Sequence, residues 1–468
     1  MSIPLTTNAA AVAPAIPTLS EATKVWARIG LLSFGGPAGQ IALMHKELVE
    51  EHRWIGEQRF LHALNYCILL PGPEAQQLAT YIGWLMHRTL GGLIAGILFV
   101  LPGAVVMLAL SILYTLYRDM PLVDAIFFGI KAAVLAVVVE AVLRIGRRAL
   151  RNRAMIIIAV AAFVGIYVLR IPFPLIILIA GFVGWAGNRA APMLFAGGGH
   201  GSGGAAPDAG GVVDAMFERG ELSHTVPSWR RTVRATAIGL PIWLGPVMVL
   251  WLFLGHTSVW TQIGTFFTTM AVVTFGGAYA VLAYVAQAAV ESLGWLPPGE
   301  MVDGLGLAET TPGPLILVLQ FVGFLAAYRD SGVLDPILAG SLGALLTLWV
   351  TFAPSFLFIF VGAPYSEALR GNRSISAALT AITAAVVGVI MNLAMWFALH
   401  VVFGEVRSFD FFFGAGPDLP VLASIDWRAA LLSVAAMIAM LRFKVGMIPT
   451  LIACAVAGLL LLQLPSSF

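Results

Sequence analysis

Long apolar runs separated by short polar stretches dominate the chain and predict transmembrane helices. Four runs, near residues 92–117, 121–143, 153–170 and 172–188, are each long enough to cross a ~30 Å hydrocarbon core. Two earlier runs, residues 22–50 and 58–88, are interrupted by Gly35-Gly36-Pro37 and Pro71-Gly72-Pro73. Their halves, roughly 13 to 15 residues or ~20 Å, are too short to cross alone but can reach past the midplane.

Composition supports a membrane protein. The chain is 59% hydrophobic and 11% charged, with a mean hydropathy of +0.92. Soluble proteins are about a quarter charged, so an ordinary soluble enzyme is excluded and an all-α polytopic membrane protein is predicted. The 26 Lys and Arg against 24 Asp and Glu leave no basic field for nucleic acid. Cys67 and Cys454 lie in apolar runs, no metal-ligand spacing occurs, and no cofactor is expected.

An internal repeat organises the chain. The segment "SFGGPAGQ" from Ser33 returns as "TFGGAYAV" from Thr274, and Pro71-Gly72-Pro73 returns as Pro312-Gly313-Pro314, both 241 residues later. Further matches include Trp54 with Trp295 at the same offset, and "IKAAV" at Ile130 with "ITAAV" at Ile382 at an offset of 252. Ordered anchors of unlike chemistry that recur together indicate a duplication.

The repeat predicts five parts. They are an N-terminal tail (1–21, with no signal-peptide pattern), a first repeat (22–190), a Gly/Ala-rich cytoplasmic linker (191–234), a linking transmembrane helix (235–256) and a second repeat (257–468). One crossing between two copies that each cross an even number of times turns the second copy upside down. The prediction is therefore an inverted-topology repeat, each copy having two broken helical hairpins and about four transmembrane helices.

Arginine placement favours re-entrant hairpins over full crossings at the broken runs. With hairpins, Lys24, Arg28, Lys46, Arg53, Arg59, Arg88 and the cluster at 144–153 share one side, which the positive-inside rule makes cytoplasmic. Arg219, Arg230, Arg231, Arg234, Arg370, Arg373, Arg442 and Lys444 follow on that side. The loops 291–300 and 404–426 fall outside, and Arg118, Arg170 and Arg329 are exceptions. The expected location is the inner (plasma) membrane with a cytoplasmic N-terminus.

The breaks are the candidate binding site. Irregular backbone survives in a membrane only against protein or a wet cavity. A helix that restarts there presents unpaired N–H groups and a positive dipole end, which suit an anion. The candidates are Gly35, Gly36, Pro37, Pro71, Gly72, Pro73, Gly276, Gly277, Pro312, Gly313 and Pro314, with Gln40, Gln76, Gln77 and Thr311 as neutral hydrogen-bonding groups. The alternative is that the breaks are kinks packed against neighbouring helices.

Three charged side chains are further candidates. Lys131 lies about ten residues into its helix, ~15 Å deep, and is expected to meet an anion or Glu74, or else to form a structural ion pair. Glu74 and Glu309 precede or follow a break and are candidates for coupling substrate to a proton, although Glu74 could simply stabilise a helix N-terminus. Glu140, on the opposite helix face from Lys131, is expected to pair with Arg144.

The segments "SFGGPAGQIALMHKELVEEHRWI", "LLPGPEAQQLATYIGW", "FVLPGA" and "GIKAAV" resemble the chromate ion transporter family, in its long two-domain form. The resemblance implies chromate efflux and chromate resistance, with sulfate as a related oxyanion and a proton gradient or membrane potential as driver. It assigns the FGG and PGP motifs to Gly35 through Pro37 and Pro71 through Pro73. The second copy departs from the pattern at Ala278 and Val281, and Thr383 replaces Lys131, which puts its direct role in binding in question.

The leading hypothesis is thus a secondary transporter that binds a tetrahedral oxyanion at hairpin tips near the midplane and works by alternating access. An importer of sulfate or another tetrahedral oxyanion is the alternative in the same class. An intramembrane enzyme on a lipid substrate is a remote alternative, because the chain offers only scattered histidines instead of an acid/base or metal set. The residues do not specify coupling ion, selectivity or oligomeric state.

Overall fold

The computed structural model describes residues 17–34, 36–195, 210–275, 277–366, 373–411 and 414–461. Several sequence predictions fall outside these residues. They concern most of the N-terminal tail, the core of the Gly/Ala-rich linker, the candidate site residues Gly35 and Gly276, and Arg370, which is expected to be cytoplasmic.

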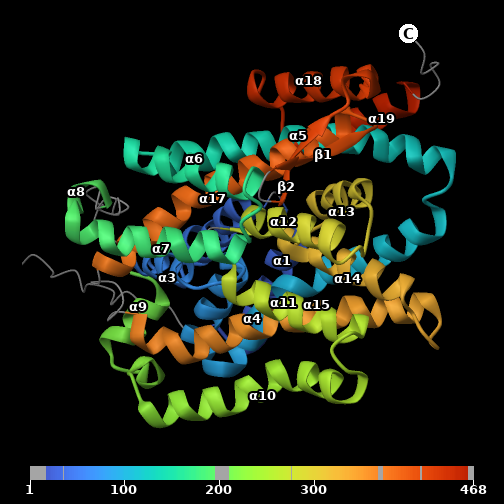
Figure 1. The fold of residues 1–468 in the computed structure, drawn as a ribbon. Helices are drawn as coiled ribbons and strands as arrows, with labels where there is room; N and C mark the ends of the chain where they lie inside the picture. The colour runs from blue at the N-terminus through green and yellow to red at the C-terminus, as the bar shows by residue number, and fades with distance from the viewer. Residues whose placement is uncertain are drawn as a thin grey trace, which may run out of the picture.

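The described chain is almost entirely helical (Figure 1), which confirms the prediction of an all-α polytopic membrane protein. The helices of the first half are α1 (Leu19–Leu32), α2 (Gly36–His45), α3 (Glu57–Leu69), α4 (Glu74–Tyr117), α5 (Pro121–Ala149), α6 (Arg153–Tyr167), α7 (Phe173–Ala190), α8 (Pro192–Phe195), α9 (Val212–Glu218) and α10 (Trp229–Leu254). Those of the second half are α11 (Val259–Val273), α12 (Ala278–Gln287), α13 (Pro298–Thr310), α14 (Val318–Arg329), α15 (Pro336–Gly362), α17 (Arg373–Val402), α18 (Trp427–Leu441) and α19 (Met447–Leu461). Among the described residues, six helices are long and apolar enough to cross a membrane: α4, α5, α7, α10, α15 and α17.

Helix α4 reverses direction at His87 and Arg88, which have non-helical backbone angles. Gly83 and Gly91 would be ~12 Å apart along a straight helix. Instead, a Cβ atom built on Gly83 would lie 2.5 Å from the carbonyl oxygen of Gly91. The segment before the reversal therefore packs antiparallel to the segment after it, and glycine at both positions allows the close approach. The apolar run predicted to start near residue 92 starts at this turn.

One end of the molecule is held together by the linker, at the left of Figure 1, where α8 and α9 lie. Asp214 of α9 accepts hydrogen bonds from the Gly56 amide (2.7 Å) and from Arg59 Nε (2.5 Å), where α3 begins. A ring nitrogen of His224 lies 3.0 Å from the carbonyl oxygen of Trp84, just before the reversal in α4. The linker thus contacts both ends of the broken segment 57–86, which leaves from and returns to the same end.

The broken segment in the second half is closed in the same way, at the opposite end. Arg329, the last residue of α14, pairs with Glu300 in the first turn of α13 (2.6 Å) and donates to the carbonyl oxygen of Trp295 (2.5 Å). Arg118, which follows α4, also pairs with Glu300. The chain from 298 to 329 therefore enters, breaks and returns to its starting end.

The same end explains the arginines that the positive-inside rule leaves as exceptions. Arg118 and Arg329 share Glu300, and Arg170 binds Glu291 (2.7 Å) and Asp418 (2.8 Å). The three arginines together face three carboxylates, Glu291, Glu300 and Asp418, which offset their positive charge as a group. The positive-inside rule counts Lys and Arg in each loop and ignores ion pairs with other segments. The paired arginines therefore add little net positive charge to the loops in which the rule counts them.

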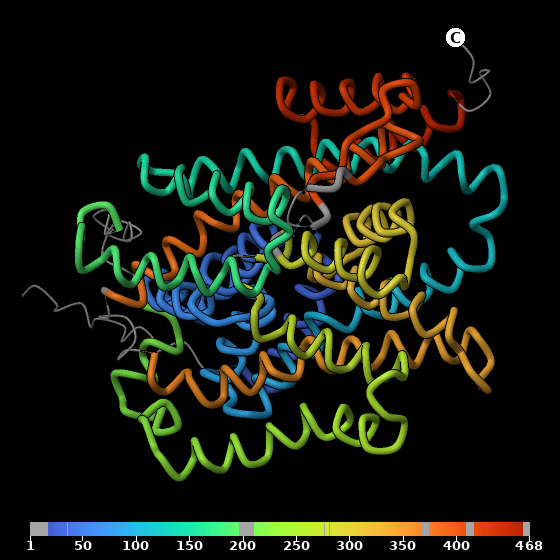
Figure 2. The backbone as a smooth tube through the Cα atoms, viewed as in Figure 1, coloured from blue at the N-terminus to red at the C-terminus, as the bar shows by residue number. Residues whose placement is uncertain are grey.

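A short β-hairpin lies within the acidic stretch 404–426, where the sequence predicts only a loop. Strands β1 (Val406–Phe411) and β2 (Gly414–Pro420) are antiparallel, with Val406 opposite Pro420. Asp418 on β2 supplies one of the carboxylates to Arg170. Figure 2 shows this hairpin beneath the last helices, α18 and α19, and α10 alone along the opposite side.

Candidate functional site

All four predicted breaks meet at one small cavity of about 20 Å³. It lies between the start of α2, the break before α4, the break before α12, and the turn that follows Pro312-Gly313-Pro314. The structure thus brings together motifs that are up to 280 residues apart in sequence. The lining residues are Pro37, Gln40, Gly72, Pro73, Glu74, Ala75, Thr274, Gly277, Ala278, Pro314, Leu315 and Ile316.

Two reciprocal backbone hydrogen bonds join the breaks of the two halves. The amide of Gly72 donates to the carbonyl oxygen of Thr274 (2.9 Å), and the amide of Gly313 donates to that of Ser33 (2.7 Å). Gly72 and Gly313, and likewise Ser33 and Thr274, are 241 residues apart. Both glycines have positive φ angles, +113° and +89°, which side chains disfavour. Each Pro-Gly-Pro turn therefore pairs with the helix end before the Gly-Gly motif of the other half.

A second reciprocal contact places the kinked long helices against the same turns. Gly103 of α4 and Ser355 of α15, each directly after a proline inside its helix, are 252 residues apart. A Cβ atom on Gly103 would collide with the carbonyl oxygen of Pro312, and one on Gly72 would lie 3.1 Å from Ser355 Oγ. Each long helix therefore packs tightly against the break of the opposite half.

Helix N-termini face the cavity without side-chain caps. Pro73, Gly277 and Pro314 occupy the position before the first helical residue, and none of their side chains accepts a hydrogen bond from the first turn. Free N–H groups in a first turn attract anions. At Gly36 and Gly277, with φ of +72° and +98°, an added Cβ would meet no atom within 4 Å. The backbone there is open to a bound group.

Glutamine side chains donate hydrogen bonds to backbone carbonyl oxygens at the breaks. Gln40 Nε2 donates to the carbonyl oxygen of Gly313 (2.6 Å), and Gln77 Nε2 donates to that of Pro71 (2.7 Å). In the described part of the chain, the Oε1 atoms of both and the Ser355 hydroxyl are buried without a hydrogen-bond partner. An amide nitrogen carries two hydrogens, so each glutamine has a second donor to offer.

Some of the described candidates at the breaks do not line the cavity: Gly36, Pro71, Gln76, Gln77, Thr311, Pro312 and Gly313. Gln76 Nε2 donates to Thr80 Oγ1 (3.2 Å), and the Thr311 hydroxyl donates to the carbonyl oxygen of Ala308 (3.0 Å). Both side chains are buried.

Two carboxylates approach the breaks from different halves. Glu74, the first residue of α4, lines the cavity, and among the described residues its carboxylate has no hydrogen-bond or ion-pair partner. Glu309, near the end of α13, accepts a hydrogen bond from the Tyr279 hydroxyl (2.7 Å). Tyr279 follows Ala278, which lines the cavity, so Glu309 is connected to the site through one side chain. The sequence did not single out Tyr279.

Lys131 lies away from the cavity and forms an ion pair, the alternative that the sequence left open, with Asp303 and not with Glu74. Its Nζ is 3.4 Å from Asp303 Oδ1, and Asp303 Oδ2 accepts a hydrogen bond from the Tyr114 hydroxyl (2.8 Å). Asp303 is eight residues before Thr311, which is ~12 Å along a helix. A buried cation in a membrane needs a partner, and the acid supplies it. The predicted pair of Glu140 with Arg144 is present at 3.8 Å.

The cluster of Tyr114, Asp303 and Lys131 has an equivalent set of positions elsewhere in the repeat. At the repeat offsets, Ser366 corresponds to Tyr114, His62 to Asp303 and Thr383 to Lys131. A ring nitrogen of His62 lies 3.4 Å from the Ser366 hydroxyl. The same two repeat positions are therefore in contact in both arrangements.

The chain is similar to known transport proteins over most of its length. The sequence pattern that describes the family "Chromate transporter" matches residues 20–185 and again 261–459. A chromate transport protein of Pseudomonas aeruginosa is 32% identical over 371 residues, covering 78% of this chain and 77% of the relative. A chromate transport protein of Cupriavidus metallidurans is 28% identical, covering 80% and 81%.

A shorter relative matches a single half. The uncharacterised transporter YwrB of Bacillus subtilis is 27% identical over 162 residues, which is 34% of this chain but 82% of the relative. No solved structure matches the chain. With the family pattern matched in both halves and relatives aligned over more than three quarters of the sequence, this chain belongs to the chromate transporter family.

Proposed function

We propose that the protein exports chromate from the cytoplasm, and so confers chromate resistance, by binding the ion where the four breaks meet. The observation that carries the proposal is the convergence of uncapped helix N-termini from both halves on one cavity. Such termini bind a tetrahedral oxyanion through N–H groups and dipoles without a fixed countercharge. The site residues are the candidates given above, with Gln76 and Thr311 as supports behind the lining and Lys131 acting through Asp303.

The small size of the cavity supports alternating access. A space of about 20 Å³ is close to that needed for one water molecule, so a chromate ion enters only if the breaks separate. The reciprocal bonds of Gly72 and Gly313 join the two halves and are the contacts that such a movement exchanges. Two inverted repeats, residues 22–190 and 257–468, joined by the linking helix, then rock against each other in the inner membrane, with the N-terminus cytoplasmic.

Energy coupling is assigned to the carboxylates at the breaks. Glu74 shares the cavity with the proposed anion and competes for the same N–H donors. Protonation would remove this competition, so binding of the oxyanion is linked to binding of a proton at Glu74, and a proton gradient affects the rate of transport. Glu309, which is connected to the cavity through Tyr279, is the coupling candidate of the second half.

The alternative function is uptake of sulfate. Backbone N–H groups and glutamine amides contact oxygen atoms and do not distinguish chromate from another tetrahedral dianion of similar size. Nothing in the donor set favours metal or acid/base chemistry, so a transporter is proposed in place of an enzyme.

Flux into inverted membrane vesicles tests the proposal. Labelled chromate and labelled sulfate are supplied to vesicles with and without an imposed proton gradient. We expect chromate to accumulate, and to do so faster with the gradient. Accumulation of sulfate but not chromate in right-side-out vesicles would favour the importer, and no flux of either ion would refute both.

A further inference from the structure

A second and much larger cavity lies outside the break site, between α10 and the core. Its volume is about 1100 Å³, and its walls come from α4 after the reversal, from α15, from α10 and from the linker before α10. It shares no lining residue with the cavity at the breaks. This groove, called the α10 groove below, therefore has its own chemistry.

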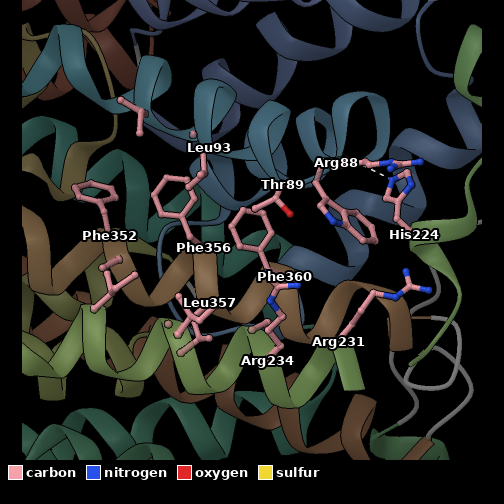
Figure 3. Close-up of a pocket in the computed structure, with 18 of the residues that line it drawn as sticks. Arg88, Thr89, Leu93, His224, Arg231, Arg234, Phe352, Phe356, Leu357 and Phe360 are labelled. Carbon is pink, nitrogen blue, oxygen red and sulfur yellow. Dashed lines mark hydrogen bonds between the residues drawn. The ribbon is translucent and has the colours of Figure 1, made fainter. Parts of the chain in front are cut away.

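One end of the α10 groove is basic (Figure 3). Arg88, Arg231 and Arg234 all line it, and His224 lies beside them. In the part of the chain that the structure describes, none of the three arginines forms an ion pair, although Arg231 donates to the carbonyl oxygen of Ser223 (3.1 Å). Burial lowers the pKa of His224, and the charges of Arg88 and Arg231 lower it further.

The repeat shows that this positive charge is specific to the first half. Arg88 corresponds to Arg329, which is neutralised by Glu300. The position that corresponds to Glu300 is Arg59, and Arg59 is itself paired with Asp214. Arg88 thus lacks the acid that its counterpart has. It also adopts a φ of +55°, which costs a non-glycine residue free energy and is typical of functional positions.

The rest of the α10 groove is apolar and open to the membrane. Phe352, Phe356 and Phe360 from α15 line its wall, and in Figure 3 Phe352 lies farthest from Arg88 and His224. Ile97 on α4 and Ile238 on α10, which also line it, are 49% and 51% exposed. From Arg231 to Ile242 along α10 is ~16 Å. This length matches one leaflet of a ~30 Å hydrocarbon core, so the basic end lies at the membrane surface.

We propose that the α10 groove binds an anionic phospholipid from the leaflet on the linker side. The phosphate of the headgroup pairs with Arg88, Arg231 and Arg234, and an acyl chain lies along the phenylalanines. Guanidinium groups are suited to bidentate phosphate contacts, and basic clusters beside transmembrane helices attract the anionic lipids of the cytoplasmic leaflet. A small inorganic anion would contact only the basic end and would leave the apolar part of the groove unfilled.

Lipid-dependent thermal stability of the full-length protein in detergent tests the proposal. Phosphatidylglycerol is the probe and phosphatidylcholine the neutral reference. We expect phosphatidylglycerol to raise Tm by about 2 °C or more and phosphatidylcholine to raise it less. Glycerol phosphate, which has the headgroup charge but no acyl chain, is expected to have no effect.

Variants then locate the effect. Arg231→Gln combined with Arg234→Gln should remove the response to phosphatidylglycerol, whereas Arg147→Gln with Arg148→Gln, two exposed arginines outside the groove, should keep it. Ala235→Trp fills the apolar part without changing charge and should also remove the response. An equal response in all variants, or equal responses to both lipids, would overturn the proposal. Loss of the lipid response on adding chromate would assign the groove to the transported ion instead.

Discussion

Gly72 and Gly313 make the same hydrogen bond in opposite directions across the centre of the protein. Each donates its amide to the residue that ends the helix before the Gly-Gly motif of the other half, Thr274 or Ser33. The positive φ of both glycines directs these amides, and the prolines on either side end one helix and start the next. The interface between the halves is therefore also the wall of the proposed site.

Replacing Gly72 should stop transport. Gly72→Ala forces a φ of +113° on alanine and places Cβ 3.0 Å from Gln77 Nε2 and 3.1 Å from Ser355 Oγ. Strain of about 1–3 kcal/mol at the Gly72–Thr274 hydrogen bond predicts a loss of chromate flux of roughly tenfold or more. Gly72→Leu should abolish the flux. Vesicle flux is measured at equal protein level in the membrane.

The control for Gly72 is Gly332→Ala. Gly332 also has a positive φ, +60°, but an added Cβ there meets nothing within 4 Å. Comparable flux losses in the two variants would mean that backbone strain lowers flux wherever it occurs in the chain. Normal flux in Gly72→Ala would mean that the Gly72–Thr274 hydrogen bond has no role in transport.

Lys131 is predicted to act through Asp303. Lys131→Ala leaves a buried carboxylate without its cation, which costs several kcal/mol, so chromate flux should be lost. If the lysine serves only to balance that charge, Lys131→Ala with Asp303→Ala should recover flux at least in part. A double variant that reaches the membrane at normal level but stays inactive would instead make Lys131 a ligand of the ion.

Glu74 is predicted to couple the proton gradient to chromate movement. Glu74→Gln keeps the size and hydrogen-bonding atoms but cannot ionise, so chromate exchange should continue while its acceleration by a proton gradient disappears. Glu140→Gln is the matched control, because Glu140 pairs with Arg144 and does not line the cavity. An unchanged response to the gradient in Glu74→Gln would contradict the assignment.

Cysteine labelling tests the orientation of the two halves. In a background where Cys67 and Cys454 are replaced, Arg88→Cys should not react with an impermeant reagent from outside, whereas Val333→Cys should. Val333 lies in the fully exposed turn after α14, close to Arg329, the repeat counterpart of Arg88. Labelling of both from the same side would rule out inversion.

The meeting of the four breaks was easier to predict from the sequence than the contacts around them. Motif recurrence and half-helix length indicated that the breaks at Gly36, Gly72, Gly277 and Gly313 form one site, because those signals are local and repeated. The pairing of Lys131 could not be found from its own helix, since Asp303 lies 172 residues away. A signal existed, because Lys131 is the only charged residue between Asp124 and Glu140 on α5, and Asp303 is the only one between Glu300 and Glu309 on α13.

Tertiary pairing also explains the topological exceptions. Arg118, Arg170 and Arg329 contradict a charge count by loop but are neutralised by Glu291, Glu300 and Asp418 from other segments. The reversal of α4 at His87 could not be predicted from the sequence, for a different reason. No proline or glycine marks His87 or Arg88, and only the close packing of Gly83 on Gly91 reveals the turn.

The central claim is that chromate binds where the four breaks meet. Anomalous diffraction at the chromium absorption edge, from protein crystallised with chromate, measures this directly. A single chromium peak between Pro37, Glu74, Ala278 and Pro314 is the predicted result. A peak at the arginines of the α10 groove or beside Lys131, with none at the breaks, would contradict the claim.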